Sequence, residues 1–230
     1  MSDLRGRHVV VTGGAGALGG SVVSAFVAAG ARCHVPVHGD KAPPAQAGVE
    51  FVTGIDLTNE TAVTSFYAGL PPELWASVHL AGGFAMGGIT ETSLGDLRTQ
   101  FDMNAVTAFL CCREAVRRFR LRPGGGGGRI VNVTARTALQ PAAQKSAYSL
   151  AKGAVASLTA NLAEELKGES ILVNAIAPGT IDTPANRASM PELEESRMVK
   201  PADIAAVITW LASPENRMAS GAIIPVYGNS

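Results

Sequence analysis

Short apolar runs alternate with longer segments of helical spacing along almost the whole chain. The apolar runs predict strands at residues 8–11, 33–37, 50–55, 77–81, 129–133, 171–177 and 222–226. Apolar positions three and four residues apart predict helices at residues 18–29, 60–69, 94–121, 146–166 and 201–212. Strands that are apolar at consecutive positions are typical of a parallel sheet covered by helices on both faces. The alternation predicts the α/β class: one doubly wound parallel sheet of about seven strands, in a single domain over residues 1–230.

Two segments depart from this alternation. Residues 184–200 hold Pro184, Pro191 and a charged run at 192–197, and no regular period fits them. One interpretation is a solvated helix face; the other is a lid over the substrate, because long irregular segments in α/β domains often close over ligands. Pro123 and the glycines at 124–128 predict a flexible connector between a helix and a strand, with no function of its own.

Composition and charge agree with a globular domain. The 230 residues are 47% hydrophobic and 17% charged, which is not a disordered composition. Because 19 Lys and Arg balance 19 Asp and Glu, the formal net charge is zero. A neutral chain has no bulk attraction for nucleic acid or an anionic membrane, so we expect neither of those partners, and a small-molecule substrate is left as the alternative.

An uncharged stretch from residue 9 to residue 31 follows Arg5 and Arg7, as in a signal peptide or a membrane span. Six glycines interrupt the stretch, at positions 13, 14, 16, 19, 20 and 30. We interpret it as a buried strand followed by a buried helix. The expectation is a cytoplasmic protein with no targeting segment.

Cysteine and histidine show no metal or disulfide pattern. Cys33, Cys111 and Cys112 are odd in number and lack zinc spacing, so we interpret them as small buried apolar residues in a reducing cytosol. The four histidines are scattered without metal spacing, and no metal is predicted.

A glycine-rich turn lies directly between the first predicted strand and the first predicted helix. Small residues there let the backbone approach a pyrophosphate, and the helix start offers free N–H groups and a positive dipole end. The candidate cofactor contacts in this turn are Gly13, Ala15, Ala17, Leu18 and Gly19. The alternative is that the glycines serve only tight packing of the strand against the helix.

Two later strand ends fit the same nucleotide. Asp56 and Leu57 end the third predicted strand, where a carboxylate is placed to accept from an adenine amino group. Ala81, Gly82 and Gly83 end the fourth without bulky side chains, as a cofactor lying across the sheet edge requires. Each of these two segments is an ordinary turn when taken alone. Because they follow successive strands, together they favour a site that binds a dinucleotide.

Tyr148 and Lys152 stand four residues apart near the start of a predicted helix, so both side chains share one face. An ammonium beside a phenol favours the phenolate and lowers the phenol pKa. We therefore expect a tyrosine that exchanges a proton with a substrate oxygen near neutral pH.

These motifs, taken in order, resemble the short-chain dehydrogenase/reductase family, whose fold is a Rossmann fold. The resemblance covers residues 7–228 and rests on Thr12-Gly13-x-x-x-Ala17-x-Gly19, Asp56-Leu57, Ala81-Gly82-Gly83, Asn104, Tyr148-x-x-x-Lys152 and Pro178-Gly179-x-Ile181-x-Thr183. It implies an NAD(P)-dependent oxidoreductase in which Tyr148 is the acid/base and Lys152 binds the nicotinamide ribose and tunes Tyr148. It also implies that Asn104 holds a water linking Lys152 to solvent. Cofactor contacts are implied at Pro178, Gly179, Ile181 and Thr183, with Thr183 on the carboxamide.

One position departs from the family pattern. A serine usually stands thirteen residues before the tyrosine and holds the substrate carbonyl, but Ala135 occupies that position here. Thr134 is adjacent, yet strand side chains alternate faces, so we expect it to point away. Thr137, Gln140 or Gln144 are the alternatives for a donor from the following loop. Loss of one oxyanion donor commonly costs a factor of about 10²–10³ in rate.

A branch of the family also lacks this serine. Dihydropteridine reductase carries alanine there and reduces a quinonoid pterin, an already electrophilic system. Residues 14–19, 81–85, 151–155 and 182–191 resemble it. Three functions stay open: reduction of a carbonyl-like or quinonoid substrate with Tyr148 as proton donor, a conventional carbonyl or 3-oxoacyl reductase, and a catalytically weak NAD(P)-binding sensor.

The cofactor and the oligomer are left as alternatives. Val37 stands where NAD-preferring members carry an acid, which permits the 2′-phosphate of NADPH, and His38 offers that phosphate a weak contact. The dihydropteridine reductase resemblance implies NADH instead. The family resemblance also implies a homodimer or homotetramer through the helices at 94–121 and 146–166. The helical stripe of Val106, Phe109, Leu110 and Arg113 is compatible with core packing or a subunit interface; by itself it favours core packing, and the oligomer is implied by the resemblance alone.

Overall fold

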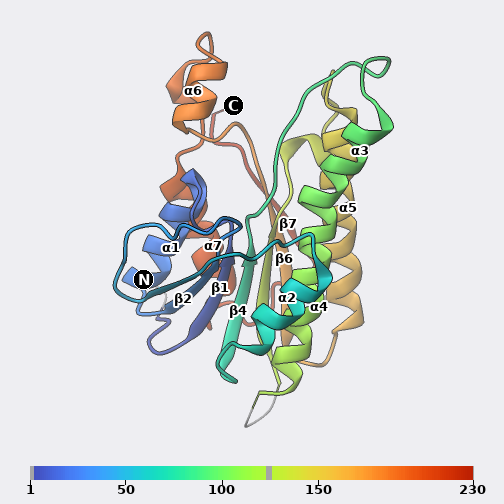
Figure 1. Ribbon diagram of the computed structural model, residues 1–230. Helices are drawn as coiled ribbons and strands as arrows, with labels where there is room; N and C mark the ends of the chain where they lie inside the picture. The colour runs from blue at the N-terminus through green and yellow to red at the C-terminus, as the bar shows by residue number, and fades with distance from the viewer. Residues whose placement is uncertain (1–2, 123–125, 230) are drawn as a thin grey trace.

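The computed structural model describes residues 3–122 and 126–229, which are built around one sheet of parallel strands (Figure 1). The strands are β1 (His8–Thr12), β2 (Arg32–Pro36), β3 (Val49–Val52), β4 (Leu74–His79), β5 (Gly128–Val133), β6 (Ile171–Pro178) and β7 (Ile223–Val226). Their order is β3-β2-β1-β4-β5-β6-β7, so the winding reverses between β3 and β4. The predicted doubly wound parallel sheet is confirmed.

Helices cover both faces of the sheet because successive strand residues point to opposite sides. In β1, Val9 and Val11 belong to the hydrophobic cluster under α1 (Ala17–Ala28) and α7 (Pro201–Ala212). Val10, between them, belongs to the cluster under α2 (Glu60–Ala68), α4 (Thr107–Arg120) and α5 (Ser146–Glu165). Residues 9–31 form β1, the glycine turn and α1, as the sequence predicts for a buried strand and helix. Among the described residues, no helix combines the length and apolarity needed to cross a membrane.

The helix predicted at residues 94–121 is interrupted. α3 (Leu94–Phe101) and α4 are joined by a π-helical turn at Asp102–Val106, where the Thr107 N–H donates to the Asp102 carbonyl five residues back. A π-turn adds one residue to a helical turn, and such turns frequently occur at functional sites. The apolar spacing continues on both sides of the turn, so the sequence pattern does not reveal it.

The predicted glycine connector is shorter than expected. Residues 123–125 lie outside the described residues, whereas Gly128 already begins β5. A Cβ at Gly128 would lie 2.5 Å from the Phe119 ring, so this glycine serves close packing and not flexibility. The single-domain organisation over residues 1–230 stays a prediction.

Candidate active site

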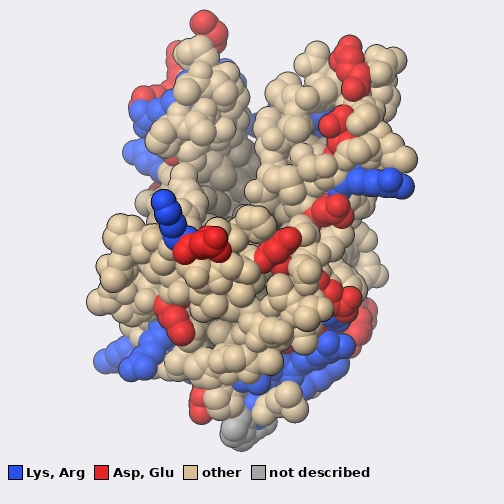
Figure 2. Space-filling model, viewed as in Figure 1, with Lys and Arg blue, Asp and Glu red and all other residues tan. Residues whose placement is uncertain are grey.

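The carboxyl ends of all the strands meet at one edge of the sheet, which we call the carboxyl edge. Figure 2 shows a deep hollow at this edge, between the lobe that carries α6 (Pro184–Ser189) and the lobe that carries α3. The surfaces facing the hollow are largely uncharged in this view. Ligands of doubly wound sheets bind outside the carboxyl ends of the strands, next to the point where the winding reverses.

The glycine turn after β1 is shaped by packing and also leaves a helix start open. Gly13 has φ +66°, and a Cβ there would lie 2.8 Å from the Ala81 nitrogen. A Cβ at Gly14 would meet the Val35 side chain at 2.8 Å, and one at Gly19 would overlap the Gly13 carbonyl. Close packing therefore requires glycine at these three positions, and the nucleotide role of the turn stays a prediction. Gly16 precedes α1 without any side-chain cap, so the first N–H groups of the helix point at the edge where an anion would sit.

The small residues after β4 make room for Asn104 and Lys152. A Cβ at Gly82 would lie 2.5 Å from Asn104 Oδ1 and 3.3 Å from Lys152 Nζ. The Ala81 N–H donates to Thr12 Oγ1 over 3.2 Å, which ties this segment to β1. Two polar side chains therefore require glycine at position 82, while the cofactor contacts at residues 81–83 stay a prediction.

Asn104 lies in the π-turn and binds the segment after β4. Its Nδ2 donates to the carbonyls of Gly83 (3.0 Å) and Gln100 (2.9 Å), and its Oδ1 accepts from the Gly83 N–H (3.3 Å). Both amide hydrogens are therefore used. The water-holding role that the family resemblance implies depends on the remaining acceptor capacity of this residue and stays a prediction.

Lys152 is buried on α5, and its Nζ donates to the carbonyl of Val133 over 2.9 Å. Burial lowers the pKa of its ammonium to about 8. The same Nζ lies 6.0 Å from the centre of the Tyr148 ring, which brings together the two predicted catalytic side chains.

The expected lowering of the tyrosine pKa is wrong for the protein alone. Burial raises the pKa of Tyr148 to about 12, because desolvation penalises the phenolate. Tyr148 therefore keeps its proton at neutral pH. That state suits a proton donor in a reduction.

The position of the missing serine is filled by Ala135, which is buried just after β5. Thr134 cannot replace the hydroxyl, because its Oγ1 donates to the Lys152 carbonyl over 2.6 Å. Gln140 is exposed, and its Oε1 accepts from Arg136 over 2.7 Å. Gln144 has φ +59° and is exposed. Thr137 differs, since its Oγ1 is buried without a hydrogen-bond partner among the described residues.

Phe84 is a site residue to which sequence reasoning assigned no role. Its ring packs edge-on against the Tyr148 ring, with centroids 4.9 Å apart and an interplanar angle of 88°. Although it touches the predicted catalytic tyrosine, Phe84 remains 55% exposed. The available sequence signal was a large apolar residue directly after a glycine pair at a strand end, where a buried role is not expected.

The predicted adenine end of the site is formed by the segments after β2 and β3. Asp56 Oδ1 accepts from the N–H and hydroxyl of Thr58 (2.9 and 2.8 Å), which lowers the pKa of the carboxyl, and lies 4.0 Å from His38 Nδ1. The Leu57 side chain is partly buried against the core. Val37 also packs on the core, and His38 is exposed.

The predicted lid contains a short helix, α6, and a 3-10 turn at Glu195–Arg197. Gly179 donates to the Val226 carbonyl after β6, and Ile181 pairs with Val199, which closes the base of the segment. Thr183 Oγ1 accepts from the Asn186 N–H (3.2 Å) and caps α6, so its own hydrogen is still available to a ligand. Ile181, Thr183 and the end of β6 at Pro178 lie along the same edge as the glycine turn.

Arg187 connects the two ends of the lid segment through ion pairs. Arg187 binds both oxygens of Asp182, at 2.6 and 2.9 Å, and also forms an ion pair with Glu195. The charged run at 192–197 therefore contributes a specific contact to the segment as well as a solvated face. Its movement over a substrate stays a prediction.

Comparisons with known proteins agree with this geometry. The sequence model of the short chain dehydrogenase family matches residues 7–194. A 3-alpha-(or 20-beta)-hydroxysteroid dehydrogenase of Mycobacterium tuberculosis is 30% identical over 245 residues, covering 99% of this chain and 90% of the relative. A crystal structure of a dehydrogenase/reductase from Sinorhizobium meliloti 1021 superimposes with a TM-score of 0.84 at 25% identity, covering 99% of this chain and 97% of the other.

A further relative matches a shorter part. An NADPH-dependent aldehyde reductase-like protein, chloroplastic, of Arabidopsis thaliana is 35% identical over 149 residues, which cover 61% of this chain. The match spans 54%, about half, of the length of that relative. On the family match over residues 7–194 and the similarity over nearly the full chain, this protein belongs to the short-chain dehydrogenase family of oxidoreductases.

Proposed function

We propose that the protein is an NAD(P)H-dependent reductase that transfers hydride to a carbonyl-like or quinonoid substrate, with Tyr148 as the proton donor. The observation that carries the proposal is the position of Tyr148 at the carboxyl edge. Tyr148 is protonated at neutral pH, lies near the buried Lys152 and packs against the edge of the exposed Phe84 ring. When bound, the nicotinamide cofactor supplies the hydride. Tyr148 supplies the proton to the substrate atom that becomes negative, and Lys152, charged at pH 7, stabilises the phenolate that is left.

The residues at the edge fit a dinucleotide. The uncapped start of α1 provides N–H groups for a pyrophosphate, and Gly82 keeps the approach to Lys152 open. We propose NADPH as the preferred form, since Val37 places no carboxylate against a 2′-phosphate and His38 lies exposed beside it. The name of the Arabidopsis relative, which specifies NADPH, supports this choice.

The substrate proposed is a flat, conjugated, already electrophilic compound, as in the dihydropteridine reductase branch. Ala135 offers no hydroxyl to polarise a plain ketone. Phe84 instead offers an exposed aromatic ring against Tyr148, and Met86 and Ile89 in the same loop are exposed as well. Aromatic faces of this kind stack on planar rings.

The test is oxidation of NADPH and NADH by the purified protein with freshly generated quinonoid dihydropteridine, beside a simple diketone. Turnover of the pterin with NADPH, and at least about tenfold slower turnover of the diketone, is the expected result. Equal rates on both compounds would favour a conventional carbonyl reductase. Binding of the cofactor with turnover of neither would contradict the proposed substrate class.

A conventional carbonyl reductase is the second candidate, and Thr137 is the observation that favours it. Its buried hydroxyl has no partner among the described residues, whereas Thr134 Oγ1 in the same loop already donates to the Lys152 carbonyl. In this case Thr137→Val would lower kcat on the diketone about 10²-fold. Under the leading proposal the same variant leaves reduction of the quinonoid compound within about twofold, because a hydroxyl is not needed there.

A further inference from the structure

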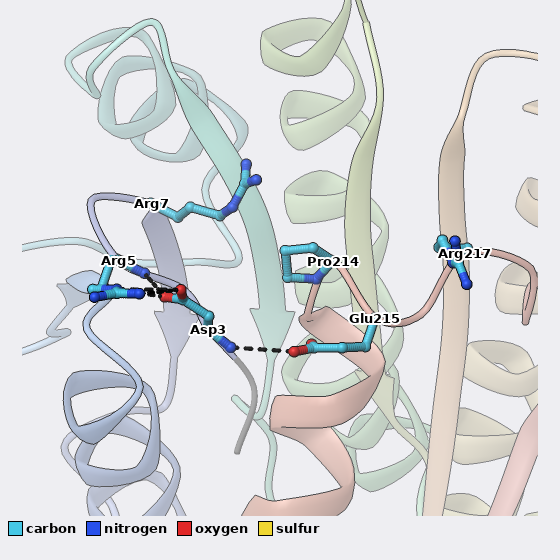
Figure 3. A pocket seen from close by; sticks show the side chains of 6 residues that line it. All are labelled: Asp3, Arg5, Arg7, Pro214, Glu215 and Arg217. Atoms are coloured by element: carbon cyan, nitrogen blue, oxygen red, sulfur yellow. Dashed lines mark hydrogen bonds and ion pairs between the residues drawn. The ribbon is translucent and has the colours of Figure 1, made fainter.

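Arginines gather at the end of the sheet opposite the active site, which we call the amino edge. A cavity of about 550 Å³ lies there, lined by Asp3, Arg5, Arg7, Pro214, Glu215 and Arg217 (Figure 3). Three of these side chains are cationic and two are anionic. The chain as a whole is neutral, so this local excess of positive charge is not a reflection of composition.

The two acids of the cavity are turned toward other groups. Asp3 is held by Arg5 through contacts of 2.7 and 3.0 Å, and this pairing lowers the pKa of its carboxyl to about 2. Glu215 Oε1 accepts from the Asp3 N–H over 3.3 Å. Figure 3 shows Asp3 between Arg5 and Glu215, while the Arg7 guanidinium extends away from both acids. Arg7 and Arg217 form no ion pair with any residue in the described part of the chain.

Next to the cavity, three guanidinium groups lie close to the ring of Trp75. Arg7 lies over the Trp75 ring at 3.7 Å from its centre, with Arg129 at 5.0 Å and Arg122 at 5.4 Å. The Trp75 indole is fixed by its Nε1 donating to the Ala212 carbonyl over 2.8 Å. Stacking on a fixed ring holds the Arg7 head group in place before any ligand arrives.

These like charges oppose one another. Burial first, and then Arg7 and Arg122, lower the pKa of Arg129 to about 10. Burial and then Arg122 also lower the pKa of Arg7, while the Asp3 carboxylate raises it. Arg7, Arg122 and Arg129 form no ion pair with a carboxylate of the described residues, in contrast to Arg120, which pairs with Glu169. A group of cations held together without such partners is stabilised by an anion from outside.

We propose that the cavity at the amino edge binds a phosphate-bearing anion, with Arg7 and Arg217 as its principal ligands. One guanidinium group can bind two phosphate oxygens at once. Arg129 and Arg122, which lie around the Trp75 ring, add positive potential. The cavity volume accommodates a group of pyrophosphate size. The site is separate from the dinucleotide site, since the two lie at opposite ends of the parallel strands.

The test is calorimetric titration of the protein with inorganic pyrophosphate at constant ionic strength. Arg7→Gln with Arg217→Gln is expected to weaken pyrophosphate binding at least about tenfold and to leave the Kd for NADPH within about twofold. The matched control, Arg98→Gln with Arg197→Gln, removes the same charge from exposed positions on α3 and in the lid segment. It is expected to change pyrophosphate binding less than about twofold. Arg217→Gln alone, at an exposed position, provides the same test if the double variant does not fold.

Parallel titrations identify the source of the phosphate. Orthophosphate and ATP, with sulfate as the comparison, distinguish a free phosphate from the phosphoryl chain of a nucleotide, and tighter binding of either than of sulfate supports the proposal. Pyrophosphate binding that is displaced by NADPH and unchanged in the Arg7 and Arg217 variants would overturn it, because the anion would then occupy the glycine turn. Binding of polyglutamate but not of pyrophosphate would also overturn it, in favour of an acidic protein segment.

Discussion

The two edges of the sheet are built in opposite ways from the same alternation of strand and helix. At the carboxyl edge, glycines remove side chains, and the buried polar groups Lys152, Asn104 and Thr134 are bonded to the main chain. At the amino edge, long cationic side chains surround a buried indole. At one edge small residues leave the backbone accessible, and at the other edge cationic side chains are concentrated. The contrast predicts that removal of one hydroxyl lowers turnover at the carboxyl edge. Removal of positive charge is predicted to weaken anion binding at the amino edge.

The largest effect is expected for Tyr148→Phe, which deletes the proton donor and little else. Turnover of any reducible substrate should fall by a factor of about 10²–10⁴, while the Kd for NADPH stays within about twofold. Tyr227→Phe, at a tyrosine after β7, is the control for loss of a phenol and should keep its rate. Full activity of Tyr148→Phe would exclude the mechanism proposed here. Loss of cofactor binding together with activity would instead indicate a structural role.

Gly82→Ala should give the next largest loss. The added methyl would lie 2.5 Å from Asn104 Oδ1 and 3.3 Å from Lys152 Nζ, so the lysine or the asparagine must move. A displacement of about 1 Å in an active site costs about 10²-fold in rate, and we expect a loss of that size in kcat/KM. Gly20→Ala is the matched control, since a Cβ there meets nothing within 4 Å. The control should retain activity and unfold at an equal or higher temperature, because alanine favours the helix.

The sequence predicts most of the carboxyl edge because that edge depends on local motifs. The glycine turn, the alanine–glycine pair after β4 and the spacing of Tyr148 and Lys152 each lie within one short segment. Three features were beyond such motifs. The π-turn around Asn104 leaves the apolar spacing intact, the Phe84–Tyr148 contact joins separate loops, and the pKa of Tyr148 depends on burial, which no spacing shows.

The arginine cluster of the amino edge is invisible in the sequence for a similar reason. Arg7, Arg129 and Arg217 precede β1, begin β5 and follow α7, so only the folded sheet brings them to one end. The chain's zero net charge hides the local excess. Electrostatic sites assembled from remote segments need the topology and the register before they can be recognised.

Lys152 should make the free energy of unfolding increase with pH in the alkaline range. Its pKa is about 8 in the folded state and near 10.5 when unfolded, so the unfolded state binds more protons between these values. Stability contributed by this group therefore rises as pH increases through that window. Relative to Lys152→Met, the free energy of unfolding of the wild type should increase by about 2 kcal/mol between pH 7 and pH 9.5. Urea unfolding of both proteins across that range measures the difference, and parallel pH profiles would contradict the burial of a charged lysine.

The smallest effect is expected near the amino end of the sheet, at a chain of two histidines and a glutamate. His34 Nδ1 lies 2.9 Å from Glu50 Oε2, and His34 Nε2 lies 2.8 Å from His8 Nδ1. Burial lowers the pKa of both histidines; Glu50 opposes this, Glu73 also raises the pKa of His8, and Arg32 lowers it further.

Glu50→Gln removes the carboxylate and keeps the shape. Because the folded pKa values lie below the unfolded value of 6.5, the unfolded state binds more protons in acid, and stability falls as pH drops below 6.5. Without the carboxylate this fall should be steeper, since nothing then favours the protonated ring. Glu50 is largely exposed, so the cost at pH 7 should be only about 0.2–1 kcal/mol. Unfolding measured from pH 7 to pH 5 in both proteins gives the difference directly, and identical pH profiles would show that Glu50 does not act on the histidines. Activity should be unchanged, because the titrating group at this end is separated by the length of the strands from Tyr148.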